Sequence, residues 1–197
     1  MKKIICIILI YVCTLASGFA QDGEIIDVEV IDPRRHTFTS FGQAARNPLE
    51  VYKLRLSGHY LNIYPQELSI FKNLVSLSLN GNEIPFILPE IGDLVNLEIL
   101  ALYDNPNLST LPAEISKLKK LKQLYLSGCN FSVLPKEIED LENLELLDVR
   151  NNQNLTILSV NFQKLKKLKY LDVKNPKMSL EEKVKIKKML PNCRIVE

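Results

Sequence analysis

Tryptophan, histidine and glycine are scarce in this chain. Its 197 residues include no tryptophan, two histidines (His36 and His59) and seven glycines. The sequence also has no glycine-rich phosphate loop, no histidine paired with a nucleophile and no cysteine pairs at metal-ligand spacing. It therefore predicts no catalytic, metal or cofactor site, and we expect that the protein is not an enzyme.

An excess of one charge is lacking as well. The chain carries 25 basic and 23 acidic side chains, and two of the lysines, Lys2 and Lys3, lie at its extreme N-terminus. The rest of the chain is therefore formally neutral. Because nucleic-acid-binding domains carry a clear basic excess, we expect no nucleic-acid partner.

Long apolar runs are confined to residues 1–20. There a basic start is followed by an apolar stretch from Ile4 to about Ala16 and by small residues up to Ala20, which is the pattern of a secretory signal peptide. The stretch is shorter than the ~20 residues that span a bilayer. We expect cleavage after Ala20, no membrane insertion, and a secreted or cell-surface protein, with the periplasm as an alternative. If the leader is retained, an intracellular signalling scaffold becomes the alternative.

One phrase recurs along the chain at a period of 23 or 24 residues. Its clearest copy runs from Leu97 to Asn105 and continues through Leu111-Pro112 and Ile115. Alternation in a strand places Leu100 and Leu102 inward and the residues between and beside them outward. A single unit cannot bury its own leucines, so the copies must stack. The six copies begin at Val51, Leu74, Leu97, Leu121, Leu144 and Leu168.

A polar residue ends the strand phrase in most copies. Asn82, Asn105 and Asn152 hold this position, where a side-chain amide can pair with backbone groups of the coil interior. His59 and Cys129 take the same place in the first and fourth copies, and we interpret them as structural residues rather than as a metal ligand or a reactive thiol.

This phrase resembles the leucine-rich-repeat pattern L-x-x-L-x-L-x-x-N-x-L over residues 51–174. The resemblance implies an α/β fold, a right-handed solenoid (horseshoe) of about six units with a concave parallel β-sheet. Solenoid ends expose core and need caps, so we predict an N-terminal cap over residues 21–50 and a C-terminal cap over residues 175–197.

The caps have their own local patterns. In the first, an alternating strand is predicted over residues 26–30 and a short helix over 40–46. In the second, Ser179 and Glu182 have capping-box spacing before a helix that Pro191 ends, and a last edge strand follows. With the repeats, these flanks resemble the exported leucine-rich-repeat proteins of leptospiral spirochaetes. The resemblance implies a surface or secreted binding protein.

Only Cys129 and Cys193 remain outside residues 1–20. They are about three repeats apart, and at ~4.8 Å per stacked strand their Cα atoms lie beyond the ~7 Å that a disulfide spans. We therefore expect two free thiols.

Charges alternate in sign between neighbouring units. Lysines dominate residues 117–122, acidic residues dominate 137–145, and lysines return over 164–169. Because stacked units align, we interpret these rows as ion pairs that set the register on a solvated flank.

The outward residues of the sheet need not pack in the core, and some of them form the candidate site. Tyrosine and arginine beside an apolar centre are favoured at protein-binding hot spots. We predict that Tyr125 is central, with Tyr103 on the preceding strand and Leu146 on the following one, and that a monomer binds a protein partner here. Two alternatives stay open: these residues serve cross-strand packing, or the protein is a structural, self-associating envelope component. The predicted site consists of Ile99, Tyr103, Tyr125, Leu146, Asp148, Arg150, Tyr170 and Asp172.

Overall fold

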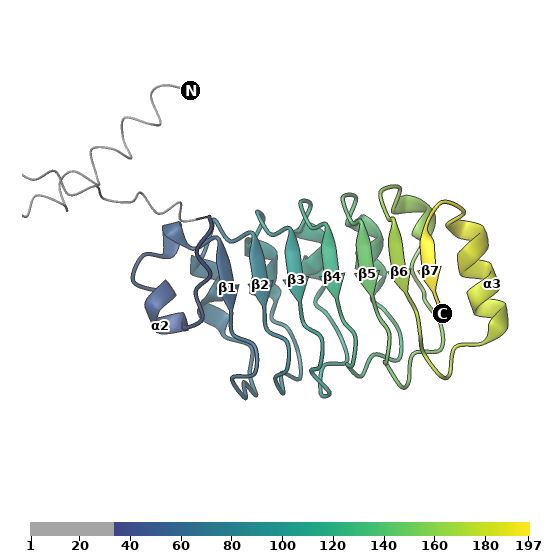
Figure 1. The fold of residues 1–197 in the computed structure, drawn as a ribbon, viewed down its shortest axis with the longest axis horizontal. Coiled ribbons are helices and arrows are strands. Elements are labelled where there is room, and N and C mark those ends of the chain that lie inside the picture. Colours follow the sequence, from purple (N-terminus) through teal and green to yellow (C-terminus); the bar gives the residue numbers. More distant parts are fainter. Residues whose placement is uncertain (1–33) are drawn as a thin grey trace, which may run out of the picture. The chain divides into compact units, whose positions relative to one another are not determined.

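The computed structural model describes residues 34–197, a stack of coils that runs from a small helical cap to a longer C-terminal helix (Figure 1). The signal peptide predicted for residues 1–20 and the strand predicted for 26–30 lie outside the described residues. Seven parallel strands form one sheet in chain order. The strands are β1 (Lys53–Arg55), β2 (Ser76–Ser78), β3 (Ile99–Ala101), β4 (Gln123–Tyr125), β5 (Leu146–Asp148), β6 (Tyr170–Asp172) and β7 (Arg194–Val196).

A short 3₁₀ helix lies on the side of each coil opposite the sheet. The Leu-Pro-x-Glu-Ile segment fixes where it starts: Pro112, for example, is the residue immediately before η4, and Ile115 turns into the core. The last of these helices, in the coil without the proline, has three residues where its predecessors have five. The outer helices are η2 (Gln66–Ile70), η3 (Pro89–Asp93), η4 (Ala113–Lys117), η5 (Lys136–Asp140) and η6 (Phe162–Lys164).

The leucines of the repeat form one continuous core between the sheet and the outer helices. Leu100 and Leu102, predicted to face inward, are fully buried, and Phe71, Phe131 and Phe162 fill the larger spaces. The fold class, a leucine-rich-repeat solenoid with a parallel sheet, is thus confirmed.

A ladder of side-chain amides supports the edge of the core. Asn105 is fully buried, and its Nδ2 donates to the Leu102 carbonyl of its own coil at 2.8 Å and to the Leu79 carbonyl of the preceding coil at 3.1 Å. Its Oδ1 accepts from the Ile84 amide of the preceding coil at 3.1 Å. Asn82 and Asn152 make the corresponding contacts.

Cys129 takes the place of asparagine in the ladder, and the carbonyl of the preceding coil still has a side-chain donor. Its thiol donates to the Leu102 carbonyl at 3.3 Å, and burial raises its pKa to about 11. The third coil has less need of an acceptor, because Pro106 has no N–H and the Leu108 amide donates to the Asn105 carbonyl at 2.9 Å. A weak acceptor such as sulfur therefore suffices here. His59, in contrast, is exposed at the first coil.

The C-terminal cap extends the same interactions. Asn175 continues the ladder, since its Oδ1 accepts from the Asn152 amide at 2.8 Å and its Nδ2 donates to the Val149 carbonyl at 3.1 Å. The helix α3 (Leu180–Met189) starts at Ser179, whose hydroxyl accepts from the Glu182 amide at 3.2 Å. The reciprocal half of the capping box is not formed: the Glu182 carboxylate accepts from the Leu158 amide at 3.2 Å and so joins the cap to the last full coil.

At the other end, α2 (Phe41–Ala44) and η1 (Pro48–Glu50) cover the first coil. Phe38 adds a parallel bridge to Leu54 of β1. Within residues 34–197, no helix is long and apolar enough to span a membrane.

Candidate functional site

The eight predicted site residues all project from the face of the sheet that points away from the core. The register decides which of them are direct neighbours. Tyr125 lies opposite Ala101 on β3 and Asp148 on β5. Leu146 on β5 and Tyr103, two residues after the end of β3, are therefore its diagonal neighbours.

Three of the eight residues line one hollow of about 430 Å³ on this face. Ile99, Tyr103 and Tyr125 form its apolar wall and are half-buried. Lys53 and Arg55 of β1 line the same hollow, although the sequence prediction did not include them. They occupy the same alternating positions as the predicted residues, but the prediction selected the aromatic and apolar cluster of the later strands.

Tyr125 is held in place by its own strand. Its hydroxyl donates to Gln123 Oε1 at 3.0 Å, two residues before it on the same face. Partial burial, and secondarily the charge of Asp148, raises the pKa of the phenol, so it stays a neutral donor. A fixed ring with a polar tip is suited to contact a partner at little cost in side-chain entropy.

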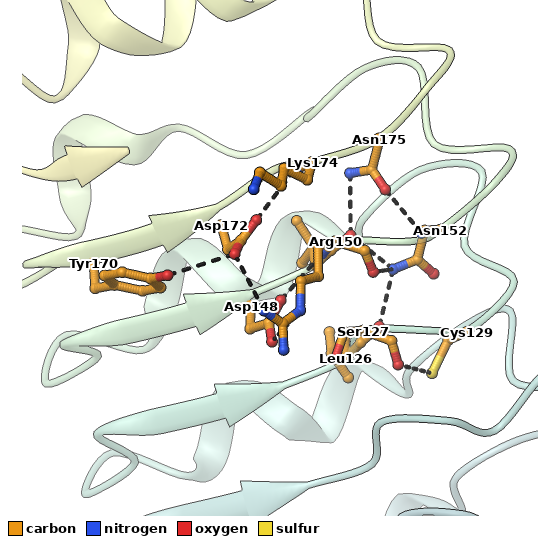
Figure 2. A network of polar contacts seen from close by, with 11 residues as sticks. Leu126, Ser127, Cys129, Asp148, Arg150, Asn152, Tyr170, Asp172, Lys174 and Asn175 are labelled. Carbon is orange, nitrogen blue, oxygen red and sulfur yellow. Dashed lines mark hydrogen bonds and ion pairs between the residues drawn. The ribbon is translucent and has the colours of Figure 1, made fainter. Parts of the chain in front are cut away.

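Asp148 and Asp172 are paired across β5 and β6, and both are buried, with only 5% and 2% of their surface exposed. The prediction counted both carboxylates as part of the binding surface. Instead, Arg150 lies over them, with Nε 3.4 Å from Asp148 Oδ2 and one terminal guanidinium nitrogen 3.6 Å from Asp172 Oδ2 (Figure 2). Burial raises the pKa of Asp148, while the backbone amide and the guanidinium of Arg150 oppose that shift. The two buried carboxylates therefore hold the guanidinium of Arg150 in place, and the side chain of Arg150 is half exposed.

Tyr170 lies at the end of this arrangement. Its hydroxyl donates to Asp172 Oδ2 at 3.5 Å, as Figure 2 shows, and the guanidinium of Arg194 on β7 lies 5.8 Å from the centre of its ring. Arg194 was absent from the prediction because β7 lies beyond the recognisable repeats. Leu146, half-buried, is the direct neighbour of Tyr170 on β5.

The first two strands carry a different surface. Ser57 Oγ lies 2.9 Å from Ser78 Oγ and donates to Asn80 Oδ1 at 2.8 Å, and Ser78 also donates to Asn80. These small side chains satisfy one another and leave no large apolar group exposed between them.

The predicted charge rows are partly ion-paired. Lys122, Lys164 and Lys169 bind Glu98, Glu139 and Glu145 at 2.7, 2.5 and 2.6 Å. Lys119 and Lys120 instead donate to the Asp140 carbonyl and to Asn96 Oδ1. The flank thus combines ion pairs with hydrogen bonds between coils.

Few of the described residues could support metal binding or thiol chemistry. No cluster of three or more His, Cys, Asp or Glu side chains in residues 34–197 is placed to hold a metal ion. Cys129 and Cys193 are both free thiols, and burial raises the pKa of each to about 11, far from a reactive thiolate.

Known proteins share this architecture. A family model for the leucine-rich repeat region matches residues 49–192, whereas no curated protein matches the sequence significantly. The structure of a leucine-rich-repeat protein of Leptospira interrogans is similar at a TM-score of 0.59 and 28% identity, over 82% of this chain and 46% of that one. The leucine-rich-repeat ectodomain of the Arabidopsis thaliana receptor kinase GASSHO1/SCHENGEN3, solved with CASPARIAN STRIP INTEGRITY FACTOR 2, gives 0.45 and 28%, over 61% of this chain and 18% of that one.

The chain spans less than half the length of either structure. The match to the leptospiral protein confirms the resemblance to bacterial leucine-rich-repeat proteins. Because the family model covers most of the chain, the protein belongs to the leucine-rich-repeat family, whose members are generally non-enzymatic modules that bind protein partners.

Proposed function

We propose that the protein is an exported binding module that engages a protein partner through the outward face of its sheet. The observation that carries the proposal is the hollow lined by Ile99, Tyr103 and Tyr125, which are half-buried and lie outside the core, with Tyr125 held by its hydrogen bond to Gln123. Proteins bury such aromatic and apolar groups at the centre of an interface. Arg150, held over two buried carboxylates, supplies a fixed polar contact beside it.

The charges around the hollow add to its specificity. Lys53 and Arg55 line one side of it, and Asp148 and Arg150 follow on the strand beyond Tyr125. A partner surface with an apolar centre and an acidic edge toward β1 fits this distribution, because opposite charges across an interface favour the correct orientation.

The experiment uses residues 21–197 as bait for host extracellular material and for bacterial envelope material. The affinity of the captured partner is then measured by titration calorimetry for the parent, Tyr125→Ala and Ser78→Ala. Tyr125→Ala should lose about 2 kcal/mol of binding free energy. Ser78→Ala removes only a small hydroxyl from the lining of the same hollow and should lose far less affinity than Tyr125→Ala.

A result of unchanged affinity for Tyr125→Ala with a lowered melting temperature would assign the tyrosine to cross-strand packing and refute the proposal. Concentration-dependent self-association without a captured partner would favour the structural alternative. Export has its own test, the N-terminal mass of the native protein: a start at Gln21 in the medium supports it, and an intact Met1 inside the cell contradicts it.

A further inference from the structure

A row of exposed apolar side chains runs along one edge of the solenoid, away from the sheet. Four members directly precede the buried residue that opens the outer turn of their coil, and the fifth, Leu180, is the first residue of helix α3. Thr110 holds the position in the third coil. The row consists of Ile63, Phe86, Val133, Ile157 and Leu180, all exposed.

Two observations show that the last three members of the row are neighbours in space. Val133 and Ile157 form a parallel bridge outside the main sheet, so their coils pair here at strand spacing. Ile157 and Leu180 line one groove with Val184 of α3. Earlier along the edge, the Glu83 and Asn130 amides donate to the carbonyls of Leu61 and Leu108 in the preceding coils.

An acidic row follows the apolar one. Glu67, Glu90, Glu114 and Glu137 are the glutamates of the outer turns, at the same position in four successive coils. Ile63 and Glu67 line a common groove, which places the two rows next to each other. Within residues 34–197, no lysine or arginine forms an ion pair with any of the four, in contrast to the paired glutamates of the flank.

We propose that this edge is a second docking surface, which takes a basic amphipathic helix of a protein partner. The apolar stripe of the helix lies on the apolar row, and its lysines or arginines face Glu67, Glu114 and Glu137, whereas Glu90 accepts from Gln66 Nε2 at 3.4 Å and has its other carboxylate oxygen buried. This surface is separate from the hollow on the sheet, so the proposal does not depend on the function proposed for that face.

The spacing favours a helix over an extended segment. Coils that pair at strand spacing are ~4.8 Å apart, and one helical turn advances ~5.4 Å. Over the five steps from Ile63 to Leu180, a helix drifts by only ~3 Å from the row. An extended chain repeats each face every ~6.6 Å and loses register about three times faster.

The charges exclude the simplest competing occupant. An apolar row on an extracellular protein could contact a membrane, but anionic lipid headgroups would be repelled by the glutamates beside the row, which have no basic partner. The same glutamates attract a basic peptide and raise its rate of association.

The test uses a fluorescent helical peptide of about 18 residues, ~27 Å long, with leucine at every third and fourth position and lysine between. Controls are a scrambled peptide of equal composition and a peptide with glutamate in place of lysine. Anisotropy titrations should show binding of the first peptide alone, weakened at least tenfold by Val133→Ser and by Glu114→Lys together with Glu137→Lys.

Val95→Ser is the matched control, because Val95 is as exposed (51%) as Val133 (48%) but lies on the charged flank. Val95→Ser and Tyr125→Ala should bind as the parent does. Equal affinity for the scrambled peptide, or no effect of Val133→Ser, would overturn the proposal. Loss of peptide binding in Tyr125→Ala would place the peptide on the sheet, and self-association abolished by Ile157→Ser would assign the row to a second copy of the chain.

Discussion

The sheet has two halves that share one backbone and differ in what they offer a partner. On the coils of β1 and β2, the hydroxyls of Ser57 and Ser78 both donate to Asn80 Oδ1, so their protons are already engaged. From β3 to β6, aromatic and aliphatic side chains stay half-exposed, beside an arginine fixed by buried carboxylates. Recognition requires surface that gains by leaving water, so the difference indicates that the second half provides most of the affinity, while the first half contributes the charges of Lys53 and Arg55 at the hollow.

The largest effect should come from the ion cluster of the second half. In Arg150→Ala the carboxylates of Asp148 and Asp172 stay buried without a cation, which should reduce the free energy of unfolding by about 3 kcal/mol at pH 7. That is the lower end for a broken buried pair, because Arg150 is half exposed. Urea unfolding of this variant and of Arg55→Ala, an exposed arginine of the first half, measures the contrast. Arg55→Ala should stay within about 0.5 kcal/mol of the parent.

Acid should partly repair the Arg150→Ala variant. Burial already raises the pKa of Asp148, and removal of the guanidinium should raise it further. A carboxyl with a raised pKa in the folded state favours folding at low pH and loses that contribution as the pH rises through the raised value. The deficit of Arg150→Ala should therefore shrink between pH 7 and about pH 4. A deficit that is constant over this range would show that the cluster is not the cause.

Next in size is the ladder beneath both halves. Asn105→Ala removes three buried hydrogen bonds and should cost about 2 kcal/mol in urea unfolding, because the carbonyls and the amide that it serves stay buried. Cys129→Ser, which keeps a donor for the Leu102 carbonyl, should cost clearly less. If Asn105→Ala instead lowered the affinity for the partner while the melting temperature stayed unchanged, the ladder would act in partner binding and not only in stability.

A smaller effect is expected in the polar half itself. Ser78→Ala deletes a hydroxyl that water can partly replace, and it should lower the free energy of unfolding by about 0.5–1 kcal/mol. Thermal melts at two salt concentrations check it, since neutral hydrogen bonds should show little salt dependence. A cost as large as that of Arg150→Ala would erase the contrast between the halves.

The smallest effect belongs to the flank, outside both halves. Lys119→Glu with Lys120→Glu should change stability by about 0.5 kcal/mol or less, and added salt should reduce the change. Partner binding should persist. Lost binding at an unchanged melting temperature would move the site from the sheet to the flank.

Most of the architecture follows from residue spacing. A 23- or 24-residue period of leucines implies stacked parallel strands, and the inward and outward residues alternate as predicted. Asn175 was missed because the sixth coil is one residue shorter before its asparagine. Earlier coils place Gly81, Asp104 or Asn151 there with positive φ, and the last coil omits that residue.

The site was harder to read than the fold, because it depends on neighbours from different coils. Alternation places Asp148 and Asp172 on the outward face, but only the register shows that they are adjacent and that one arginine covers both. Lys53 and Arg55 join the hollow although they precede Tyr125 by three coils. The Ser179 and Glu182 pair formed half of its box, because a backbone amide of another coil took the carboxylate.

The side-chain hydrogen bonds that the asparagine ladder makes between coils all point in one direction along the solenoid. The Oδ1 atoms of Asn82, Asn105 and Asn152 each accept from an amide in the coil before, and never from the coil after. A coil at the end of a truncated chain therefore has open donors until its successor is in place. During synthesis, each coil would therefore complete its hydrogen bonds only after the next coil has emerged. The C-terminal helix provides the last acceptor, because the Glu182 carboxylate accepts from the Leu158 amide.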